Sequence, residues 1–400
     1  MNDPRGTSGA SGQAASATPR RLLVRGVNWL GDAIMTTPAL QRLRSALPEA
    51  HIALLTHQKL ADLWRNHPSL NEILTFAANE SSWSVARRLR AGNFDTALVM
   101  PNSPRTAIEV WLARIPHRIG YARPWRDWFL TQTVPSRTGH MRMRKRSVDE
   151  IQRLIGEKTP PPQAGKSFEE SNEGVEPVNY SAHQTHEYLG LAAALGANAA
   201  LLPPKVVVTP AEIEAASAAL AQELRPFFKT KAPRPPLLLG LNPGAEYGPA
   251  KRWPAENFAQ VARQICQQHG NCVWLCFGGP ADAELGREIA KRAGGGIIEL
   301  AGKTTLRELM AALKLCQVVL TNDTGPMHLA AALDVPVVVP FGSTSPELTG
   351  PGLPGDPRHI LLRSNALCSP CFLPVCPIDF RCMAGITVER VAAAVIRAIG

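Results

Sequence analysis

Short apolar runs alternate with helical patterns along almost the whole chain, and this alternation leaves few folds open. In the clearest example, the apolar run 236–241 leads into the loop Asn242–Pro254, which is followed by the helical pattern Glu256–Arg263. Short strands separated by helices predict an α/β fold with parallel sheets. The loop Asn242–Pro254 is therefore expected at the carboxyl edge of a sheet, where α/β proteins bind their ligands.

This loop contains residues suited to a phosphate group. Gly244 and Gly248 let the backbone approach a ligand closely, and Lys251 supplies a positive charge that suits phosphate. An ordinary loop with an exposed lysine would contain the same residues. Taken alone, the loop leaves both interpretations open.

A second junction lies between the strand-like run Gln317–Thr321 and a helix of small residues. The connecting segment Asn322–His328 offers Asp323 or Thr324 as the helix cap, and Gly325 permits close approach. The free N–H groups at a helix start form an anion site, although simple capping would need no ligand.

The two loops together favour a bound diphosphate. One contributes Lys251, and the other contributes His328 just behind the cap. A histidine that is merely satisfied within the first helical turn is an equally good interpretation of His328. The sequence therefore predicts a diphosphate site in the second half of the chain.

The third junction lies near the N-terminus and contains a carboxylate. The strand-like run Arg21–Arg25 leads through the loop 26–32 into the amphipathic pattern 33–43, so Asp32 stands at a helix start. A helix cap is the simpler interpretation of Asp32. A lone carboxylate across a cleft from a phosphate site is also what an inverting sugar transferase needs as its general base. Nearby, Trp29 either lines that cleft or belongs to the core.

The chain of 400 residues is long enough for two α/β domains with sizeable cores. We expect a disordered tail at residues 1–18, which are rich in Gly, Ser, Ala and Thr and lack the apolar core of a signal peptide. The predicted domains are residues 19–200 and 201–385, with a mobile Pro- and Glu-rich insertion at 156–180. No apolar run has the length of a transmembrane helix, so we expect a cytoplasmic protein.

The net charge of +10 is concentrated in the N-terminal half. A solvated basic face is the simplest interpretation, and nucleic acid is one partner that such a face can bind. The chain has no aromatic-interleaved RNA motif and no recognisable DNA-reading helix, so we expect no nucleic-acid partner. An anionic membrane surface fits better. The clustered basic residues are Arg114, Arg118, Arg123, Arg126, Arg137, Arg142, Arg144, Lys145 and Arg146.

The eight cysteines fall into two groups. Four lie in expected helices or strands and are predicted to be small buried hydrophobes: Cys266, Cys272, Cys276 and Cys316. The other four form the pattern C-x2-C-x4-C-x5-C: Cys368, Cys371, Cys376 and Cys382. This density in a cytosolic chain suggests a metal more than disulfides, but the spacing is not a standard zinc pattern. The sequence leaves a metal site at these four cysteines open.

Five segments in the same order carry a resemblance to a known family. They are Gly31-Asp32, Pro243–Pro254, Phe277–Pro280, Leu300–Leu306 and Asn322–His328. With them the chain resembles glycosyltransferase family 9 over about residues 20 to 395. The resemblance implies the GT-B fold, in which two Rossmann-like domains with parallel sheets face one another. It also implies that the acceptor binds the N-terminal domain, that the sugar nucleotide binds the C-terminal domain, and that the C-terminal helix at 386–400 packs back on the N-terminal domain.

The resemblance implies an inverting transfer of heptose from ADP-L-glycero-D-manno-heptose to the inner core of lipopolysaccharide. The acceptor would be an anionic lipid A–Kdo–heptose, so the protein would contact the inner face of the inner membrane peripherally. Asp32 would act as the general base, and Lys251 would neutralise the leaving diphosphate. The residues implied to bind the sugar nucleotide are Gly244, Ala245, Lys251, Asp282, Asp323, Thr324, Gly325 and His328.

Two points of this mechanism stay open at the level of sequence. A helix start lowers the pKa of the Asp32 carboxyl, whereas burial near a bound sugar would raise it. Gly244 and Ala245 stand where some relatives have hydroxyl-bearing side chains. Backbone N–H groups would have to bind the phosphates there instead.

No cofactor is expected to be required. The chain has no Asp-x-Asp pair placed to bridge a diphosphate through a cation, and Mg²⁺ would at most stimulate the reaction. Another heptosyltransferase of the same family, acting at a different core position, would share much of this pattern. From a different class, a non-catalytic protein that binds nucleotides or nucleic acid would share the basic face.

Overall fold

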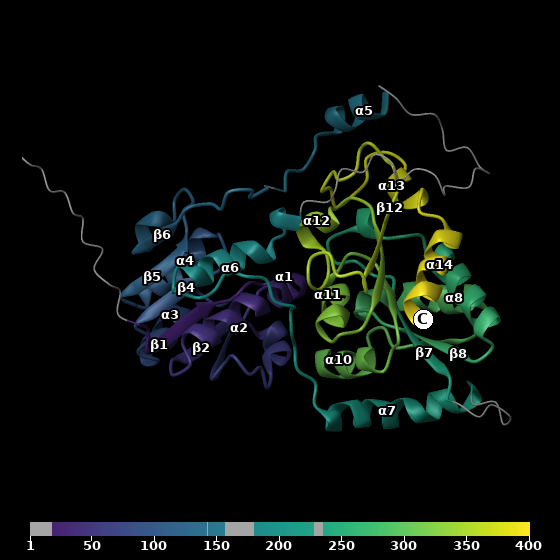
Figure 1. The fold of residues 1–400 in the computed structure, drawn as a ribbon, viewed down its shortest axis with the longest axis horizontal. Coiled ribbons are helices and arrows are strands. Elements are labelled where there is room, and N and C mark those ends of the chain that lie inside the picture. The colour runs from purple at the N-terminus through teal and green to yellow at the C-terminus, as the bar shows by residue number, and fades with distance from the viewer. Residues whose placement is uncertain (1–17, 142, 157–179, 228–234) are drawn as a thin grey trace, which may run out of the picture.

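Two six-stranded parallel sheets, each with helices packed against it, form the molecule (Figure 1). The computed structural model describes residues 18–141, 143–156, 180–227 and 235–400. The predicted tail at 1–18 and the predicted insertion at 156–180 therefore lie almost wholly outside the described residues. The predicted α/β fold with parallel sheets is confirmed.

The N-terminal sheet has the strand order β3-β2-β1-β4-β5-β6, so β1 lies inside it. Leu22, Leu23 and Val24 of β1 are fully buried, as expected for a parallel strand covered on both faces. The strands are β1 (Arg21–Arg25), β2 (His51–His57), β3 (Glu72–Phe76), β4 (Thr96–Val99), β5 (His117–Tyr121) and β6 (Gln132–Val134). The helices of this domain are α1 (Leu30–Met35), α2 (Thr37–Ala46), α3 (Ser82–Ala91), α4 (Pro104–Leu112) and α6 (Thr185–Ala193).

The C-terminal sheet has the strand order β12-β11-β10-β7-β8-β9. Its strands are β7 (Leu237–Asn242), β8 (Cys272–Cys276), β9 (Ile297–Glu299), β10 (Val319–Thr321), β11 (Val337–Phe341) and β12 (Ile360–Arg363). The helices are α7 (Pro210–Leu224), α8 (Ala255–His269), α9 (Ala283–Ala293), α10 (Leu306–Lys314), α11 (Gly325–Ala332), α12 (Pro346–Thr349), α13 (Arg381–Ala384) and α14 (Val388–Ile399). The predicted strands and helices around the loops Asn242–Pro254 and Asn322–His328 are thus present.

Local sequence explains several helix ends. Helices α7 and α10 each begin at a capping box, formed by Thr209 with Glu212 and by Thr305 with Glu308. Helix α8 ends at Gly270, whose φ of 67° is a left-handed conformation that glycine adopts at little cost.

The predicted packing of the C-terminal helix on the N-terminal domain was wrong. Helix α14 packs against α8, β11 and β12 of its own domain. Its apolar residues Val391 and Val395 are fully buried in a core cluster that contains Phe258 of α8. The apolar face of an amphipathic helix is buried against a nearby apolar surface, and α8 provides that surface here.

The predicted boundary of the N-terminal domain also needs a correction. Helix α5 (Val148–Gly156), placed by the prediction within residues 19–200, packs on the C-terminal domain through Ile151, which contacts the cluster of Cys368 and Cys371. The backbone N–H of Arg146 donates to the carbonyl oxygen of Cys371 at 3.0 Å. The chain then returns to the N-terminal domain, where α6 packs against α2.

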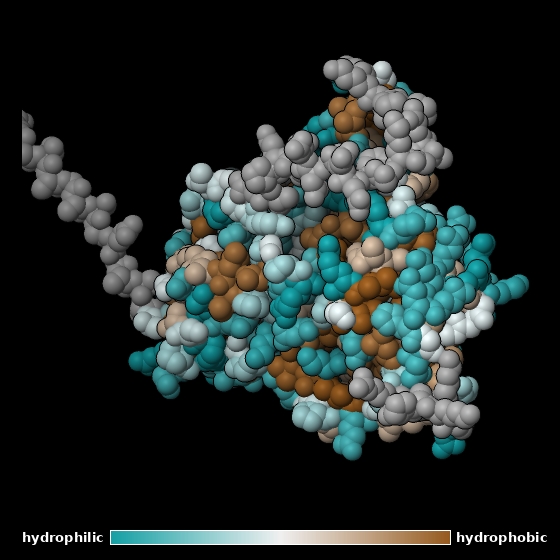
Figure 2. All heavy atoms as spheres, turned by 45° about the vertical axis from the view of Figure 1, so that its right-hand side comes forward, coloured by the Kyte–Doolittle hydropathy of each residue, from teal (hydrophilic) through white to brown (hydrophobic). Residues whose placement is uncertain are grey.

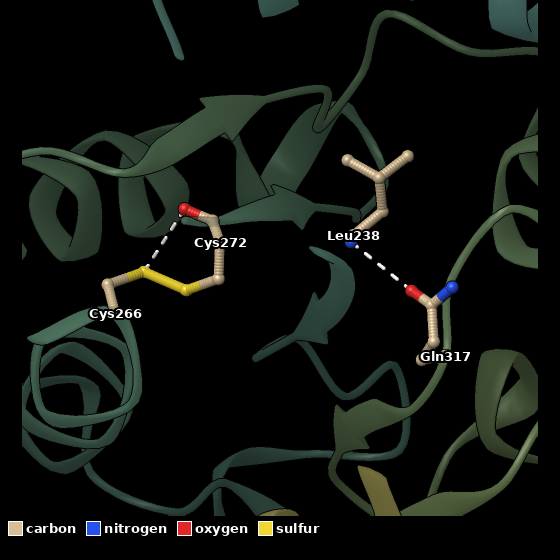
Figure 3. The surroundings of a disulfide bond; sticks show 4 residues. All are labelled: Leu238, Cys266, Cys272 and Gln317. Atoms are coloured by element: carbon tan, nitrogen blue, oxygen red, sulfur yellow. Dashed lines mark hydrogen bonds between the residues drawn. A yellow bond between two sulfur atoms is a disulfide. The ribbon is translucent and has the colours of Figure 1, made fainter. Parts of the chain in front are cut away.

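Two of the four cysteines predicted to be small buried hydrophobes are joined to each other. Cys266 near the end of α8 and Cys272 at the start of β8 form a disulfide bond (Figure 3), with Cα atoms 5.3 Å apart. The short turn between helix and strand brings the two residues within the range for a disulfide. Cys276 and Cys316 are buried, as predicted, and both are free thiols.

The surface combines hydrophilic areas with separate hydrophobic patches on the face shown in Figure 2. Within the described ranges, no helix is both long enough and apolar enough to cross a membrane. The exposed large hydrophobic side chains include Trp29, Trp83, Trp111, Trp125 and Trp128. All five tryptophans belong to the N-terminal domain.

Candidate active site

The two domains meet where α1 packs against α11. A Cβ atom added to Gly31 would lie 2.7 Å from Cδ2 of His328, and one added to Gly325 would lie 2.8 Å from Cδ2 of Leu30. Only glycine permits so close an approach at both positions. The contact brings the start of α1, which contains Asp32, to the start of α11.

Asp32 lies in the first turn of α1, directly beyond the carboxyl end of β1. Its Oδ1 atom accepts a hydrogen bond of 3.2 Å from Nε2 of Gln184. The same Nε2 donates to the hydroxyl of Tyr188 at 2.8 Å. Asp32 also lies close enough to Lys251 and Asp323 of the other domain for both charges to act on its pKa.

Burial raises the pKa of Asp32 to about 6. The hydrogen bond from Gln184 and the positive charge of Lys251 oppose this shift, and the negative charge of Asp323 adds to it. Burial therefore outweighs the lowering that the sequence predicts for a helix start. A carboxylate with a pKa near neutrality is a stronger base than an exposed aspartate.

Lys251 ends a short 3₁₀ helix, Pro249–Lys251, and points at the start of α11. Its Nζ atom lies 2.7 Å from Oδ2 of Asp323 and donates to the Asp323 carbonyl oxygen at 3.3 Å. The hydroxyl of Thr344 donates to the same carboxylate oxygen at 2.5 Å. Asp323 is only 3% exposed, so these two donors compensate its buried charge.

The predicted side-chain cap of α11 was wrong. Thr324 occupies the N-cap position but makes no side-chain cap hydrogen bond. The carboxylate of Asp323 is bound by Lys251 and Thr344 instead. The side chain of Thr324 therefore leaves the N–H groups of the first turn of α11, which includes Gly325, uncapped.

His328 is buried in α11 with its ring against Gly31. Burial lowers the pKa of His328 to about 4, although the charge of Asp323 opposes the shift. The imidazole is therefore neutral at physiological pH. Burial against Gly31 does not distinguish between the two interpretations of His328, and a contact with the donor stays a prediction.

The other residues predicted to bind the nucleotide gather around the carboxyl ends of β7 and β8. A Cβ atom added to Gly244 would lie 2.5 Å from Oδ2 of Asp282. That oxygen accepts a hydrogen bond of 3.0 Å from the backbone N–H of Gly279. Arg252 donates to the carbonyl oxygen of Ala245 at 3.3 Å and lies 3.9 Å from Oδ1 of Asp282.

Both the sequence and the fold of the chain are similar to those of known proteins. Residues 82–380 match the sequence model of glycosyltransferase family 9 (heptosyltransferase). The chain belongs to glycosyltransferase family 9. It is therefore a glycosyltransferase, and its two facing parallel sheets form the GT-B fold.

Individual members of family 9 are similar over most of the chain. Lipooligosaccharide heptosyltransferase 2 of Haemophilus influenzae is 29% identical over 342 residues, which are 82% of this chain and 85% of that protein. The solved structure of Escherichia coli ADP-heptose LPS heptosyltransferase II has a TM-score of 0.69 at 24% identity and covers 95% of this chain and 98% of that one. A family 9 glycosyltransferase structure from Veillonella parvula has a TM-score of 0.72 at 23% identity and covers 95% and 97%.

Three neighbours of the candidate site were missed by the sequence analysis of this family 9 chain. Gln184 follows the unpatterned segment 156–180, so no motif marks it. Thr344 lies beyond the carboxyl end of β11 in a run of small polar residues, and its position at the same sheet edge was a usable signal. Arg252 directly follows Lys251 and could have been included with it.

The four remaining cysteines line one small cavity of the C-terminal domain. All four are free thiols: Cys368, Cys371, Cys376 and Cys382. Among the residues that the structure describes, no group of His, Cys, Asp and Glu side chains has the arrangement of a metal site. The arrangement of these thiols therefore gives the metal interpretation no support.

Replacing Gly31 by alanine is expected to slow sugar transfer by roughly 100-fold, because the added methyl group would separate α1 from α11 and displace Asp32. Gly156→Ala is the matched control, since no heavy atom of the residues that the structure describes lies within 4 Å of its Cβ position. Steady-state kinetics of both variants test this. Equal rates for Gly31→Ala and Gly156→Ala would show that the α1–α11 contact does not position the base.

The pH dependence of the reaction is expected to report Asp32. We expect the ionised carboxylate to be the form that acts as the base, so kcat/KM should fall below a pH near 6, the value to which burial raises this pKa. Gln184→Leu removes a hydrogen bond that lowers the pKa of Asp32, so the acidic limb should move to higher pH. Tyr188→Phe keeps that bond and should leave the limb in place. An unshifted limb in Gln184→Leu would contradict the assignment.

Proposed function

We propose that this glycosyltransferase moves heptose from ADP-L-glycero-D-manno-heptose to the inner core of lipopolysaccharide, as a heptosyltransferase II. One observation carries the proposal: Asp32 of one domain faces the pair Lys251 and Asp323 of the other. A base and a diphosphate site on opposite sides of a domain interface are what an in-line sugar transfer needs. The similarity to proteins named heptosyltransferase 2 supports the choice of donor and acceptor.

The acceptor hydroxyl is deprotonated by Asp32 as it attacks the anomeric carbon of the donor. The carboxylate stands opposite the leaving group, so a single displacement inverts the anomeric configuration. Burial keeps the pKa of Asp32 near 6, which makes the carboxylate basic while leaving most of it ionised at neutral pH.

The departing diphosphate is neutralised from the C-terminal domain. Lys251 supplies a positive charge, and the uncapped start of α11 at Thr324 and Gly325 supplies backbone N–H groups. The backbone of Gly244 and Ala245 contacts the phosphates, and Asp282 accepts hydrogen bonds from the ribose hydroxyls. A lysine and a helix start carry the positive charge that a bridging cation would supply, so no metal is required, and Mg²⁺ at most stimulates.

The acceptor is an anionic lipid A–Kdo–heptose, and the enzyme acts at the cytoplasmic face of the inner membrane without a nucleic-acid partner. The excess of basic residues in the N-terminal domain supports an anionic acceptor. Because the acceptor is lipid-linked, the enzyme must reach it at the membrane surface.

The experiment is a transfer assay with ADP-heptose and a set of truncated core acceptors. The proposal expects heptose to be added to an acceptor that ends in the first heptose. Transfer to Kdo alone would indicate the activity of a heptosyltransferase I, and transfer only to longer cores that of a heptosyltransferase III. Absence of transfer to every acceptor, with tight and salt-sensitive RNA binding, would favour a nucleic-acid-binding protein.

A further inference from the structure

The connection from β5 to β6 exposes two tryptophans. Trp125 is 85% exposed and Trp128 is 90% exposed. Tryptophan side chains are highly buried on average, so two almost fully exposed ones within four residues are unusual on a protein surface. An indole ring that stays in water does not stabilise the fold. Its exposure here indicates a surface that becomes buried when the protein forms a complex.

The turn that presents these rings is held firmly. Arg126, between them, is fully buried and donates to the carbonyl oxygen of Pro101 at 2.7 Å and to Oδ1 of Asn102 at 3.2 Å. Trp125 has a φ of 66°, a left-handed conformation that costs a bulky residue energy. The arginine thus anchors the turn from inside while the two tryptophans face outward.

Further aromatic and basic residues surround this turn. Phe129 packs edge-on against Trp111, with ring centroids 5.4 Å apart, and Trp111 is itself 46% exposed. We call Trp111, Trp125, Trp128 and Phe129 the aromatic surface. Arg118 donates to the carbonyl oxygen of Phe129 at 2.7 Å, and the backbone N–H of Arg123 donates to Oδ1 of Asp127 at 2.9 Å, so two basic residues lie next to this turn. The sequence from 101 to 147 contains ten basic residues and two acidic ones.

The aromatic surface lies beside the carboxyl edge of the N-terminal sheet, the same edge at which Asp32 of α1 lies. Arg126 bonds to residues just beyond the carboxyl end of β4, so the turn covers that edge. Strands β1, β4 and β5 are parallel neighbours, which puts the carboxyl ends of β1 and β5 about 10 Å apart. A bilayer in contact with the turn would present a lipid-linked acceptor to the same edge.

We propose that the aromatic surface docks on an anionic phospholipid bilayer, with Trp125 and Trp128 in the headgroup region. Tryptophan favours this region because its ring is amphipathic, and neighbouring arginines are attracted to anionic headgroups. Trp125 and Trp128 are both almost fully exposed, whereas the hot spots of protein–protein interfaces sit in packed pockets. The inference rests on the proposed function only for the lipid-linked nature of the acceptor.

The test is sedimentation of the full-length protein with vesicles of phosphatidylethanolamine and phosphatidylglycerol, compared with vesicles of phosphatidylcholine alone. We expect binding to the anionic vesicles that weakens with salt, and a loss of about tenfold or more in Trp125→Ala/Trp128→Ala. Leu367→Ala/Val375→Ala removes two exposed apolar side chains from the other domain and is expected to bind like the wild type. Thermal unfolding checks that each variant is folded.

Unchanged vesicle binding of the tryptophan variant would overturn the proposal. Two results with the wild-type protein would also overturn it: no binding to anionic vesicles, or self-association through these residues without vesicle binding. The same proteins are assayed for heptose transfer to a deacylated core acceptor. The proposal expects equal transfer by the wild type and the tryptophan variant. Failure of the wild type in that assay would count against the proposed function and would leave the vesicle result interpretable.

Discussion

Asp32→Asn is expected to reduce heptose transfer by about 10³-fold or more while donor affinity stays within about twofold of the wild type. The amide cannot accept the proton of the acceptor hydroxyl, but it has nearly the same size and can still accept the hydrogen bond from Gln184. Transfer rates with saturating ADP-heptose, together with calorimetric binding of ADP, measure the two effects separately.

The matched control for this variant is Asp62→Asn. Asp62 is an exposed carboxylate of the same domain that pairs with Arg65 on the surface. Its loss should leave both transfer and ADP binding unchanged. If Asp32→Asn also retained full turnover, another residue would have to be the base.

Lys251→Met is expected to weaken ADP binding and to slow transfer by about 10²-fold or more, because the diphosphate loses its neutralising charge. The same change leaves the buried carboxylate of Asp323 without its ammonium partner, and removing one member of a buried pair costs about 3–5 kcal/mol of stability. The variant should therefore also unfold at a lower temperature.

The double variant Lys251→Met/Asp323→Asn separates these two effects. The uncharged pair needs no compensation, so the melting temperature should recover most of its loss. Transfer should stay low, because the ammonium group of Lys251 is still missing from the expected diphosphate site. Recovery of activity together with stability would show that Lys251 acts only as the partner of Asp323.

The sequence predicted the three junctions that form the site because each junction is local. A strand, a turn and a helix start are read from adjacent residues, and parallel sheets bring such turns to one edge. Asp32, Lys251 and Asp323 were identified in this way, and the structure brings them together. Membership of family 9 and the GT-B fold agree with the same junctions.

Other features depend on contacts between segments that are distant in the chain, so they could not be predicted from the sequence. The interaction of Gln184 with Asp32 joins residues 152 positions apart. The sequence of α14 shows that one face of the helix is apolar, but it does not show which element this face packs against. The pKa of Asp32 depends on burial at a domain interface, and no local pattern measures burial.

A crystal structure of Asp32→Asn bound to ADP-heptose tests the central claim most directly. The account predicts the diphosphate against Lys251 and the start of α11, with the anomeric carbon facing residue 32 across a gap that admits one hydroxyl, about 3 Å from each. A donor bound away from Lys251, or residue 32 turned away from the sugar, would contradict the account.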